Sequence, residues 1–243
     1  MEIKNFEKFS KEHIVFHEPG VIPPMLEDIL RKFGNKKIRV FDIGCGECNV
    51  LTQLIKKGIN ADYYGIDISK EKIERAKRIT KGKINLSVQD CSNTSFKNNY
   101  FDLIICTQVI EHVDDKGLMK ELSRILKRGG FAYITSVRRK KIAIYLYRKN
   151  GRFVSDPSHM REYSNKEEFS KLFKNFAILM YKEKRFKHSL VDLYLRFFIK
   201  IKIINPNRVL RIYEKNRFLF LVRNTIRIPL IGFYCNEILV RKN

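Results

Sequence analysis

The sequence predicts an α/β fold built on a doubly wound, mostly parallel sheet of seven strands. From residue 38 to residue 137, short apolar runs of strand length alternate with segments whose apolar residues recur at helical spacing. Such alternation is typical of parallel strands joined by right-handed crossovers. The 243 residues, 44% of them hydrophobic, are enough for one large domain with a buried core, or for one domain with an elaboration.

The first strands flank a glycine-containing loop. Residues 38–43 form an apolar run that predicts a buried strand, and the loop 44–46 follows it. Apolar residues at helical spacing then predict a helix that ends near Gly58, and residues 63–68 predict the second strand. A helix at 25–33, after two prolines, precedes them all.

The alternation continues through the middle of the chain. Ser69 is expected to be the N-cap of a helix at 70–79. Further strands are expected at 84–89, 101–106 and 130–137, with a helix at 116–126. In a parallel sheet of this kind the ligand crevice lies at the carboxyl ends of the strands, so we expect the functional residues in the loops that follow them.

The second half of the chain is less regular. Residues 138–163 are expected to be rich in loops, and the spacing of Ser164 and Glu167 predicts a capping box that opens a helix to about residue 173. Strands are expected at 177–182 and 232–241. We therefore expect an N-terminal helical lid (1–37), a core (38–184), a helical insertion (185–230) and a last core strand (231–243).

Charge is the unusual property of the composition. The 49 Lys and Arg residues against 26 Asp and Glu residues give a net charge of +23, which favours contact with nucleic acid or with an anionic membrane surface. No stretch approaches the roughly 20 apolar residues that span a bilayer, and no signal-peptide pattern opens the chain. Five cysteines without paired spacing favour the reducing cytoplasm, so any membrane contact is expected to be peripheral.

The expected insertion is basic and aromatic. The segment from Arg185 to Pro229 has eleven basic residues against Asp192 and Glu214, a net charge of +9. Apolar residues from Leu190 onward recur at helical spacing and predict an amphipathic helix. Three interpretations stay open: contact with a membrane surface or a lipid acceptor, ordinary packing of a helical subdomain, and binding of RNA.

The loop after the first strand carries the densest motif, Asp-Ile-Gly-Cys-Gly at residues 42–46. Glycines let the backbone approach a ligand closely. Asn49 takes the place of the third glycine of the dinucleotide-binding pattern, which disfavours a pyrophosphate ligand. Asp42 suits a ligand with a positively charged amino group, because a carboxylate accepts charge-assisted hydrogen bonds.

These motifs together resemble the class I S-adenosylmethionine-dependent methyltransferases, which have a Rossmann-like fold. The resemblance rests on residues 42–46, on Tyr-Gly-Ile-Asp-Ile-Ser at 64–69, on Gln-Asp-Cys at 89–91, on residues 101–113 and on Leu-Lys-Arg-Gly-Gly at 126–130. It covers residues 38–137 and departs from the family where Cys48 replaces a small residue and Arg128 replaces a proline.

The resemblance implies S-adenosylmethionine as the cofactor. By this resemblance Asp67 holds both ribose hydroxyls, and Asp90 accepts a hydrogen bond from the adenine amino group. Asp67 also lies 23 positions after Gly44, about where a ribose-binding acid emerges from the next strand. The expected cofactor-binding residues are Asp42, Gly44, Cys45, Gly46, Asp67, Ile68, Asp90, Cys91 and Gln108.

Candidate catalytic residues lie in two segments. Glu111 and His112 belong to a stretch similar to that of methyltransferases acting on quinone precursors, some of which hold a divalent metal with two acids and a histidine. Gln108 stands in place of the first acid, so we expect no metal, and Glu111 and His112 can equally cap and orient the next helix. His159 lies in a segment similar to one that borders the acceptor pocket, and is a candidate general base or a loop histidine bonded to backbone.

Cys45 and Cys48 form a C-x-x-C pattern typical of zinc or redox sites, but no second pair completes four ligands, so coincidence within the glycine loop is favoured. The expected function is methyl transfer by direct displacement to a small or lipidic acceptor. The alternatives are an RNA methyltransferase, although no Asn-Pro-Pro-Tyr type motif is present, and a non-catalytic protein with the same fold that binds the cofactor.

Overall fold

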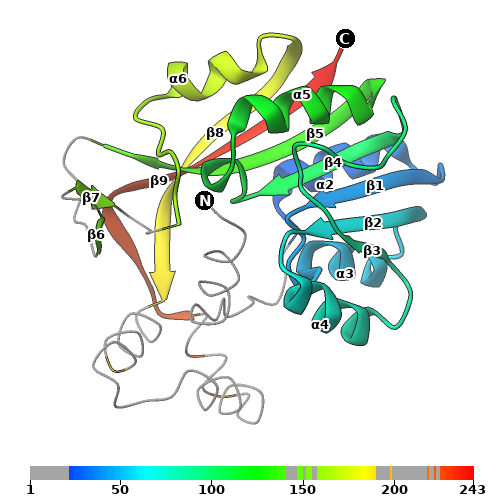
Figure 1. The fold of residues 1–243 in the computed structure, drawn as a ribbon, viewed down its shortest axis with the longest axis horizontal. Helices are drawn as coiled ribbons and strands as arrows, with labels where there is room; N and C mark the ends of the chain where they lie inside the picture. The colour runs from blue at the N-terminus through cyan, green and yellow to red at the C-terminus, as the bar shows by residue number, and fades with distance from the viewer. Residues whose placement is uncertain are drawn as a thin grey trace.

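The computed structural model describes residues 22–140, 147–149, 152–154, 158–189 and 225–243, and the single positions 198, 218 and 222. The main sheet has seven strands: β1 (Ile38–Ile43), β2 (Ala61–Asp67), β3 (Asn85–Val88), β4 (Phe101–Thr107), β5 (Leu126–Arg139), β8 (Phe176–Ser189) and β9 (Arg227–Lys242). Their order is β3-β2-β1-β4-β5-β9-β8 (Figure 1). The first five are parallel, and β9 runs antiparallel to both of its neighbours. The expected fold class is confirmed.

Helices cover both faces of the sheet (Figure 1). On one face lie α2 (Pro24–Phe33), α3 (Asn49–Lys56) and α4 (Lys70–Thr80), whose buried residues form one core cluster with β1, β2 and β4. On the other lie α5 (Asp115–Ile125), α6 (Lys166–Ser170) and the 3-10 helix η2 (Lys171–Phe173), which form the second cluster. A shorter 3-10 helix, η1 (Ile110–His112), follows β4. None of the helices in the described part is long and apolar enough to cross a membrane.

The central strands β1 and β4 are buried on both sides, which explains why their sequences are mainly apolar. Phe41 of β1 and Phe101 of β4 are both fully buried, and their rings stack with centroids 4.5 Å apart. Burying one such side chain contributes about 1.5–3 kcal/mol. This aromatic contact fixes β1 against the first residue of β4.

Helix capping confirms one expectation and corrects another. Ser69 is the N-cap of α4, and its side-chain oxygen accepts a hydrogen bond from the Lys72 backbone N–H at 3.3 Å. The expected capping box at Ser164 is displaced by one residue. Asn165 is the N-cap of α6, since its side chain accepts from the Glu168 N–H at 2.7 Å, and the Glu168 carboxylate accepts from the Ser164 N–H at 2.8 Å.

Several strands are longer than their apolar runs. β5 begins directly after α5, because Leu126 already pairs with Phe101 before a register shift. β8 and β9 remain paired as far as Ser189 and Arg227, so both strands extend into the segment 185–230. The expected loop-rich excursion contains a two-stranded sheet of β6 (Tyr147–Lys149) and β7 (Arg152–Val154). Residues 1–21 of the expected lid, and 190–224 apart from the single positions, lie outside the described residues.

Candidate active site

The glycine loop joins β1 to α3 and is tied to β2. The Cys45 N–H donates to the Ile66 carbonyl at 2.8 Å, and the Gly46 N–H donates to the Asp67 carboxylate at 3.1 Å. Gly44 has a φ of 67°, and a Cβ added there would collide with the side chain of Val109. The loop therefore needs glycine at 44, both for its left-handed backbone and for its contact with the chain leaving β4.

Two buried carboxylates lie beneath this loop. Asp42 is 2% exposed, and its Oδ1 has no hydrogen-bond partner among the described residues. Burial, with the nearby Asp67 as a second cause, raises the pKa of Asp42 to about 8. The second Asp67 oxygen accepts from the Ser69 N–H at 2.9 Å. An orphaned buried oxygen of this kind fits a cationic donor such as an amino group.

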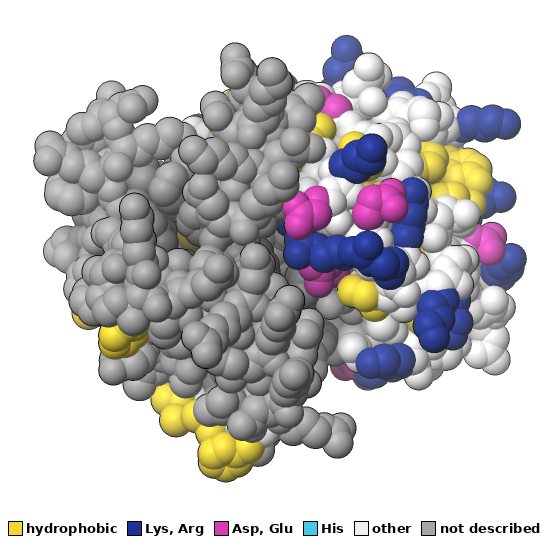
Figure 2. All heavy atoms as spheres, turned by 60° about the horizontal axis from the view of Figure 1, so that its bottom comes forward, with side chains coloured by type: hydrophobic (Ala, Val, Ile, Leu, Met, Phe, Trp, Pro, Cys, Tyr) yellow, Lys and Arg dark blue, Asp and Glu magenta, His cyan; other side chains and the backbone are white. Residues whose placement is uncertain are grey.

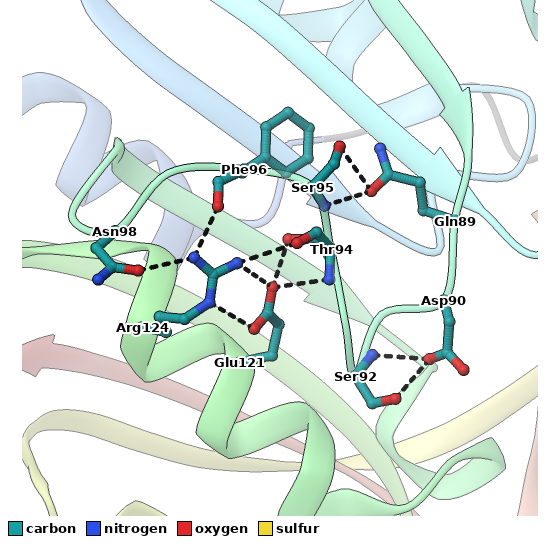
Figure 3. Close-up of polar contacts among 9 residues, drawn as sticks. All are labelled: Gln89, Asp90, Ser92, Thr94, Ser95, Phe96, Asn98, Glu121 and Arg124. Atoms are coloured by element: carbon teal, nitrogen blue, oxygen red, sulfur yellow. Dashed lines mark hydrogen bonds and ion pairs between the residues drawn. The ribbon is translucent and has the colours of Figure 1, made fainter.

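The loop after β3 holds the next predicted residues. Asp90 is exposed, and its Oδ1 accepts from the N–H and the hydroxyl of Ser92 at 2.8 and 2.7 Å (Figure 3). Cys91 is buried in the core on the α5 side of the sheet, so only its backbone can serve a ligand. Ile68, directly after β2, is half-buried. These residues line the same carboxyl edge of the parallel strands as the glycine loop.

Gln108 follows β4 in a left-handed conformation, with a φ of 56°. Its backbone N–H donates to the Thr135 carbonyl at 3.1 Å, and its side-chain amide donates to the Thr135 hydroxyl at 3.2 Å and to Cys235 Sγ at 3.6 Å. The amide nitrogen thus bonds to β5 and β9. A cofactor contact of Gln108 remains a prediction.

The two segments with candidate catalytic residues come together in space. Glu111 is fully buried and accepts from the Ser136 hydroxyl at 3.1 Å and the Val137 N–H at 3.3 Å. Burial raises the pKa of Glu111, while His159 and these hydrogen bonds act in the opposite direction. The rings of His112 and His159 meet edge to face, with centroids 4.8 Å apart. The sequence places these histidines 47 positions apart, and only the fold joins them.

His159 has a carboxylate partner that the sequence analysis missed. Its Nδ1 lies 3.1 Å from Glu162 Oε1, and both side chains are less than a tenth exposed. The other Glu162 oxygen pairs with Arg139 Nε at 3.2 Å. His112 Nδ1 lies 2.9 Å from the Ser158 hydroxyl. The spacing of three residues between His159 and Glu162 was the available signal, but such a spacing in a loop is common.

Residues 158–163 are fixed as a strap across the end of the sheet. The Met160 and Arg161 N–H groups donate to the Glu111 carbonyl at 2.9 and 3.2 Å, and the Arg161 guanidinium donates to Asp115 at 2.6 Å. At the C-terminal end of the strap, the Tyr163 carbonyl accepts a hydrogen bond from the Arg139 N–H at 3.0 Å. The strap holds His159 over η1, and Val109 joins η1 to the glycine loop.

Glu111, His112 and His159 each offer one ligand atom within 4.8 Å of the others. Compared with the metal site that the resemblance suggests, this set lacks one carboxylate because the first acid is Gln108, and each Glu111 oxygen also accepts one hydrogen bond. Hard cations such as Mg²⁺ require several oxygen ligands. A histidine held by a carboxylate, as His159 is held by Glu162, is an arrangement that suits proton transfer.

The C-x-x-C pattern lies inside the protein. Cys45 and Cys48 are both buried in the core on the α3 side, and Cys45 packs against Gly65 of β2. A hydrogen bond to Cys48, followed by burial, raises the pKa of the Cys45 thiol well above its ordinary range. Among the described residues, the group of possible metal ligands consists of Glu111, His112 and His159, and neither thiol belongs to it.

Comparisons with known proteins decide the family. Residues 41–134 match the methyltransferase domain family. The chain is 34% identical over 166 residues to the ubiquinone biosynthesis O-methyltransferase of Pelagibacter ubique (strain HTCC1062), an alignment that covers 59% of this chain and 68% of that protein. The chain belongs to the class I S-adenosylmethionine-dependent methyltransferases. The expected family is thus confirmed, and S-adenosylmethionine is its methyl donor.

Other methyltransferases agree with this assignment. The ubiquinone biosynthesis O-methyltransferase of Rickettsia canadensis (strain McKiel) is 30% identical over 161 residues, 60% of this chain and 66% of that protein. The chain therefore spans about two thirds of the length of these two curated relatives. A Haemonchus contortus phosphoethanolamine N-methyltransferase 2, solved with S-adenosylmethionine, has the same fold with a TM-score of 0.61 at 18% identity, over 100% of this chain and 60% of that chain.

Proposed function

We propose that this methyltransferase transfers the methyl group of S-adenosylmethionine to a hydroxyl group of a small or lipidic acceptor. The observation that carries the proposal is the His159–Glu162 pair, which packs against His112 of η1 and suits removal of a hydroxyl proton. The two curated relatives named above are O-methyltransferases, which supports the same acceptor atom.

The donor supplies an electrophilic sulfonium methyl group. In the proposed reaction the acceptor oxygen forms a bond to that methyl carbon, the carbon–sulfur bond breaks, and S-adenosylhomocysteine leaves. His159 takes the acceptor proton on Nε2, while Glu162 holds Nδ1 and thereby orients the ring. Placing the reactants in line accounts for about 7–11 kcal/mol of barrier lowering, and the base adds about 10²–10⁴-fold in rate.

The chain's own residues supply binding and orientation. We assign the donor's amino group to Asp42, its ribose hydroxyls to Asp67 and its adenine amino group to Asp90. The Gly44–Gly46 backbone gives close approach, and Cys45, Ile68, Cys91 and Gln108 complete the proposed cofactor site. Glu111 and His112 help to place His159. Glu111 interacts with it electrostatically, and the ring of His112 packs against its ring.

Turnover tests the proposal. The purified protein is incubated with S-adenosylmethionine labelled in the methyl group and with lipid, small-molecule and RNA fractions of a cell extract. We expect label in the small-molecule or lipid fraction, as an alkali-stable methyl ether, and its loss in Asp67→Ala. Label in RNA would support the alternative RNA methyltransferase, and cofactor binding without label in any fraction would support the non-catalytic alternative.

We also propose that the protein is cytoplasmic and makes peripheral contact with an anionic membrane surface. The paired ends of β8 and β9 expose Ile226, Ile228 and Ile231 by 46%, 38% and 61%. Exposed Arg185, Lys187 and Arg227 lie on the same strand ends. On the face that comes forward in Figure 2, Lys and Arg side chains are spread over the described surface. Each basic residue near an anionic surface contributes about 1 kcal/mol of binding.

Vesicle co-sedimentation tests this contact. Wild-type protein should bind vesicles that contain anionic lipid and not neutral vesicles, with binding that weakens as salt increases. Arg185→Glu with Lys187→Glu should reduce binding, whereas Arg78→Glu with Lys83→Glu, the same charge change on α4 and just before β3, should reduce it less. Equal failure to bind both vesicle types, with salt-sensitive binding to structured RNA, would favour the nucleic-acid alternative instead.

A further inference from the structure

One arginine of α5 fixes the loop that connects β3 to β4. Arg124 Nη1 donates to the Phe96 carbonyl at 2.7 Å and to the Asn98 side-chain oxygen at 2.8 Å, and Nη2 donates to the Thr94 carbonyl at 3.1 Å (Figure 3). Three positions of one loop thus bond to a single planar group. Only the rigid fork of a guanidinium supplies donors in this geometry, and a lysine cannot replace it.

Arg124 is itself held from within its own helix. Its Nε and Nη2 donate to the two oxygens of Glu121 at 2.8 and 2.6 Å, which is a bidentate pair (Figure 3). The same carboxylate accepts from the Thr94 N–H at 2.8 Å. Glu121 and Thr94 are 5% and 7% exposed. Although burial raises it, these hydrogen bonds hold the pKa of Glu121 below its ordinary value.

Arg124 and Glu121 together form a clamp on residues 94–98. This clamped part of the loop is joined to the part that carries Asp90. The Gln89 side-chain oxygen accepts from the Ser95 N–H at 2.8 Å, so the residue before Asp90 is bonded to the residue between Thr94 and Phe96 (Figure 3). Asp90 in turn is bonded to Ser92. The position of the Asp90 carboxylate therefore depends on the clamp, through two further sets of hydrogen bonds.

We propose that Arg124 and Glu121 are positioning residues for base recognition in the cofactor site. By fixing residues 94–98, they hold Asp90 where its carboxylate accepts a hydrogen bond from the adenine amino group. The inference rests on the role proposed above for Asp90. A recognition group must be held within about 0.5 Å of its productive position, so release of the clamp lowers selectivity for adenine before it abolishes binding.

Two ligands measure that selectivity in the full-length protein. They are S-adenosylhomocysteine and S-inosylhomocysteine, in which a carbonyl oxygen replaces the amino group that Asp90 is proposed to recognise. Calorimetry on wild type, Asp90→Asn, Arg124→Lys and Glu121→Gln gives the ratio of the two Kd values. Lys127→Met is the matched control, because it removes an ion pair from the start of β5 to Asp102 at 2.7 Å but removes no hydrogen bond to residues 94–98.

Wild type should prefer the adenosyl ligand, and Asp90→Asn should lose most of that preference. Arg124→Lys should lower the preference about tenfold, the equivalent of one hydrogen bond, and should speed amide hydrogen exchange in residues 91–98. Lys127→Met should leave the preference unchanged even if it lowers stability. Glu121→Gln should act in the same direction as Arg124→Lys, and serves in its place if the lysine variant does not fold.

The possible failures differ from one another. Unchanged preference in Arg124→Lys and Glu121→Gln, with loss in Asp90→Asn, would overturn the positioning role and leave the proposed function intact. Tight binding of both ligands by wild type without preference would overturn both Asp90 and its clamp. No binding of S-adenosylhomocysteine by wild type would overturn the proposed function itself.

Discussion

The carboxylate of Asp67 lies near enough to that of Asp42 to disfavour a second negative charge beneath the glycine loop. Asp42 is buried, and its proton is retained to a pH of about 8 for both reasons. An ammonium group placed against Asp42 would remove both penalties, because it adds a positive charge next to the orphaned oxygen. On the assignment of the donor's amino group to Asp42 proposed above, cofactor binding and ionisation of Asp42 are linked.

Binding of S-adenosylmethionine should release a proton below about pH 8. Affinity should rise with pH up to that value and then level, because the carboxylate form of Asp42 is the form that binds. Calorimetry in two buffers of different ionisation enthalpy measures the released proton. Asp42→Asn should bind more weakly and release no proton, and an equal release from that variant would assign the proton to another group.

The same pKa shift predicts how Asp42 affects the stability of the free protein. Its pKa is raised on folding from 3.8 to about 8, so the folded state binds more protons than the unfolded state between these values. The Asp42 contribution to the free energy of unfolding is therefore full below about pH 4 and is lost as pH rises to about 8. The difference in free energy of unfolding between Asp42→Asn and wild type should therefore favour the variant more at pH 8 than at pH 4. Urea denaturation of both proteins at the two pH values measures it.

Glu162→Gln should lower kcat while leaving the Kd of the cofactor unchanged. The amide keeps the shape of the side chain but does not stabilise the positive charge that His159 gains with the proton. His159→Ala should cost about 10²-fold or more in rate. Glu167→Gln, an exposed acid in the first turn of α6, is the control. Wild-type kcat in Glu162→Gln, together with an unchanged pH profile, would remove Glu162 from the mechanism.

Gly44→Ala should destabilise the protein more than Gly34→Ala. Both glycines have positive φ, at 67° and 56°, a region that alanine occupies only with backbone strain. A Cβ at 34 meets nothing within 4 Å, whereas a Cβ at 44 collides with Val109 and adds about 1–3 kcal/mol of overpacking. Urea denaturation compares the two variants, and equal losses would mean that Val109 moves aside without cost.

A chelator should leave the rate of methyl transfer unchanged. Glu111 already has both carboxylate oxygens in hydrogen bonds with β5, and in the proposed mechanism the acceptor proton leaves through His159. The measurement is kcat after dialysis against EDTA, compared with the same sample after Mg²⁺ or Zn²⁺ is added back. A loss that either ion restores would show that Glu111, His112 and His159 hold a metal.

Much of the fold follows from local sequence. The mainly apolar runs of β1 and β4 are buried on both faces, so these strands were predictable from their hydrophobicity. The extensions of β8 to Ser189 and of β9 back to Arg227 could not be predicted in this way. These strand ends are largely exposed and basic, and they pair only with each other. The capping box at Ser164 failed by one residue because Asn165 competes with it for the same role.

The candidate site was predictable only in part. Asp42 and Asp67 lie at the carboxyl ends of β1 and β2, and Asp90 lies in the loop after β3, where local motifs place them. The His159–Glu162 pair, the contact of His159 with His112 and the Arg124 clamp depend on side chains brought together by the strap and by α5. No periodicity in the sequence records such contacts between distant segments.

The place of β9 in the sheet has a consequence for how the chain folds as it is synthesised. β9 lies between β5 and β8, and β8 pairs with no other strand of the seven-stranded sheet. While the ribosome is still adding residues 227–242, β8 therefore has no partner and β5 has an open edge. At about 5–20 residues per second, this interval lasts for seconds. During this interval the charged lysines of β8 disfavour pairing of the free β8 strand with a strand of a neighbouring nascent chain.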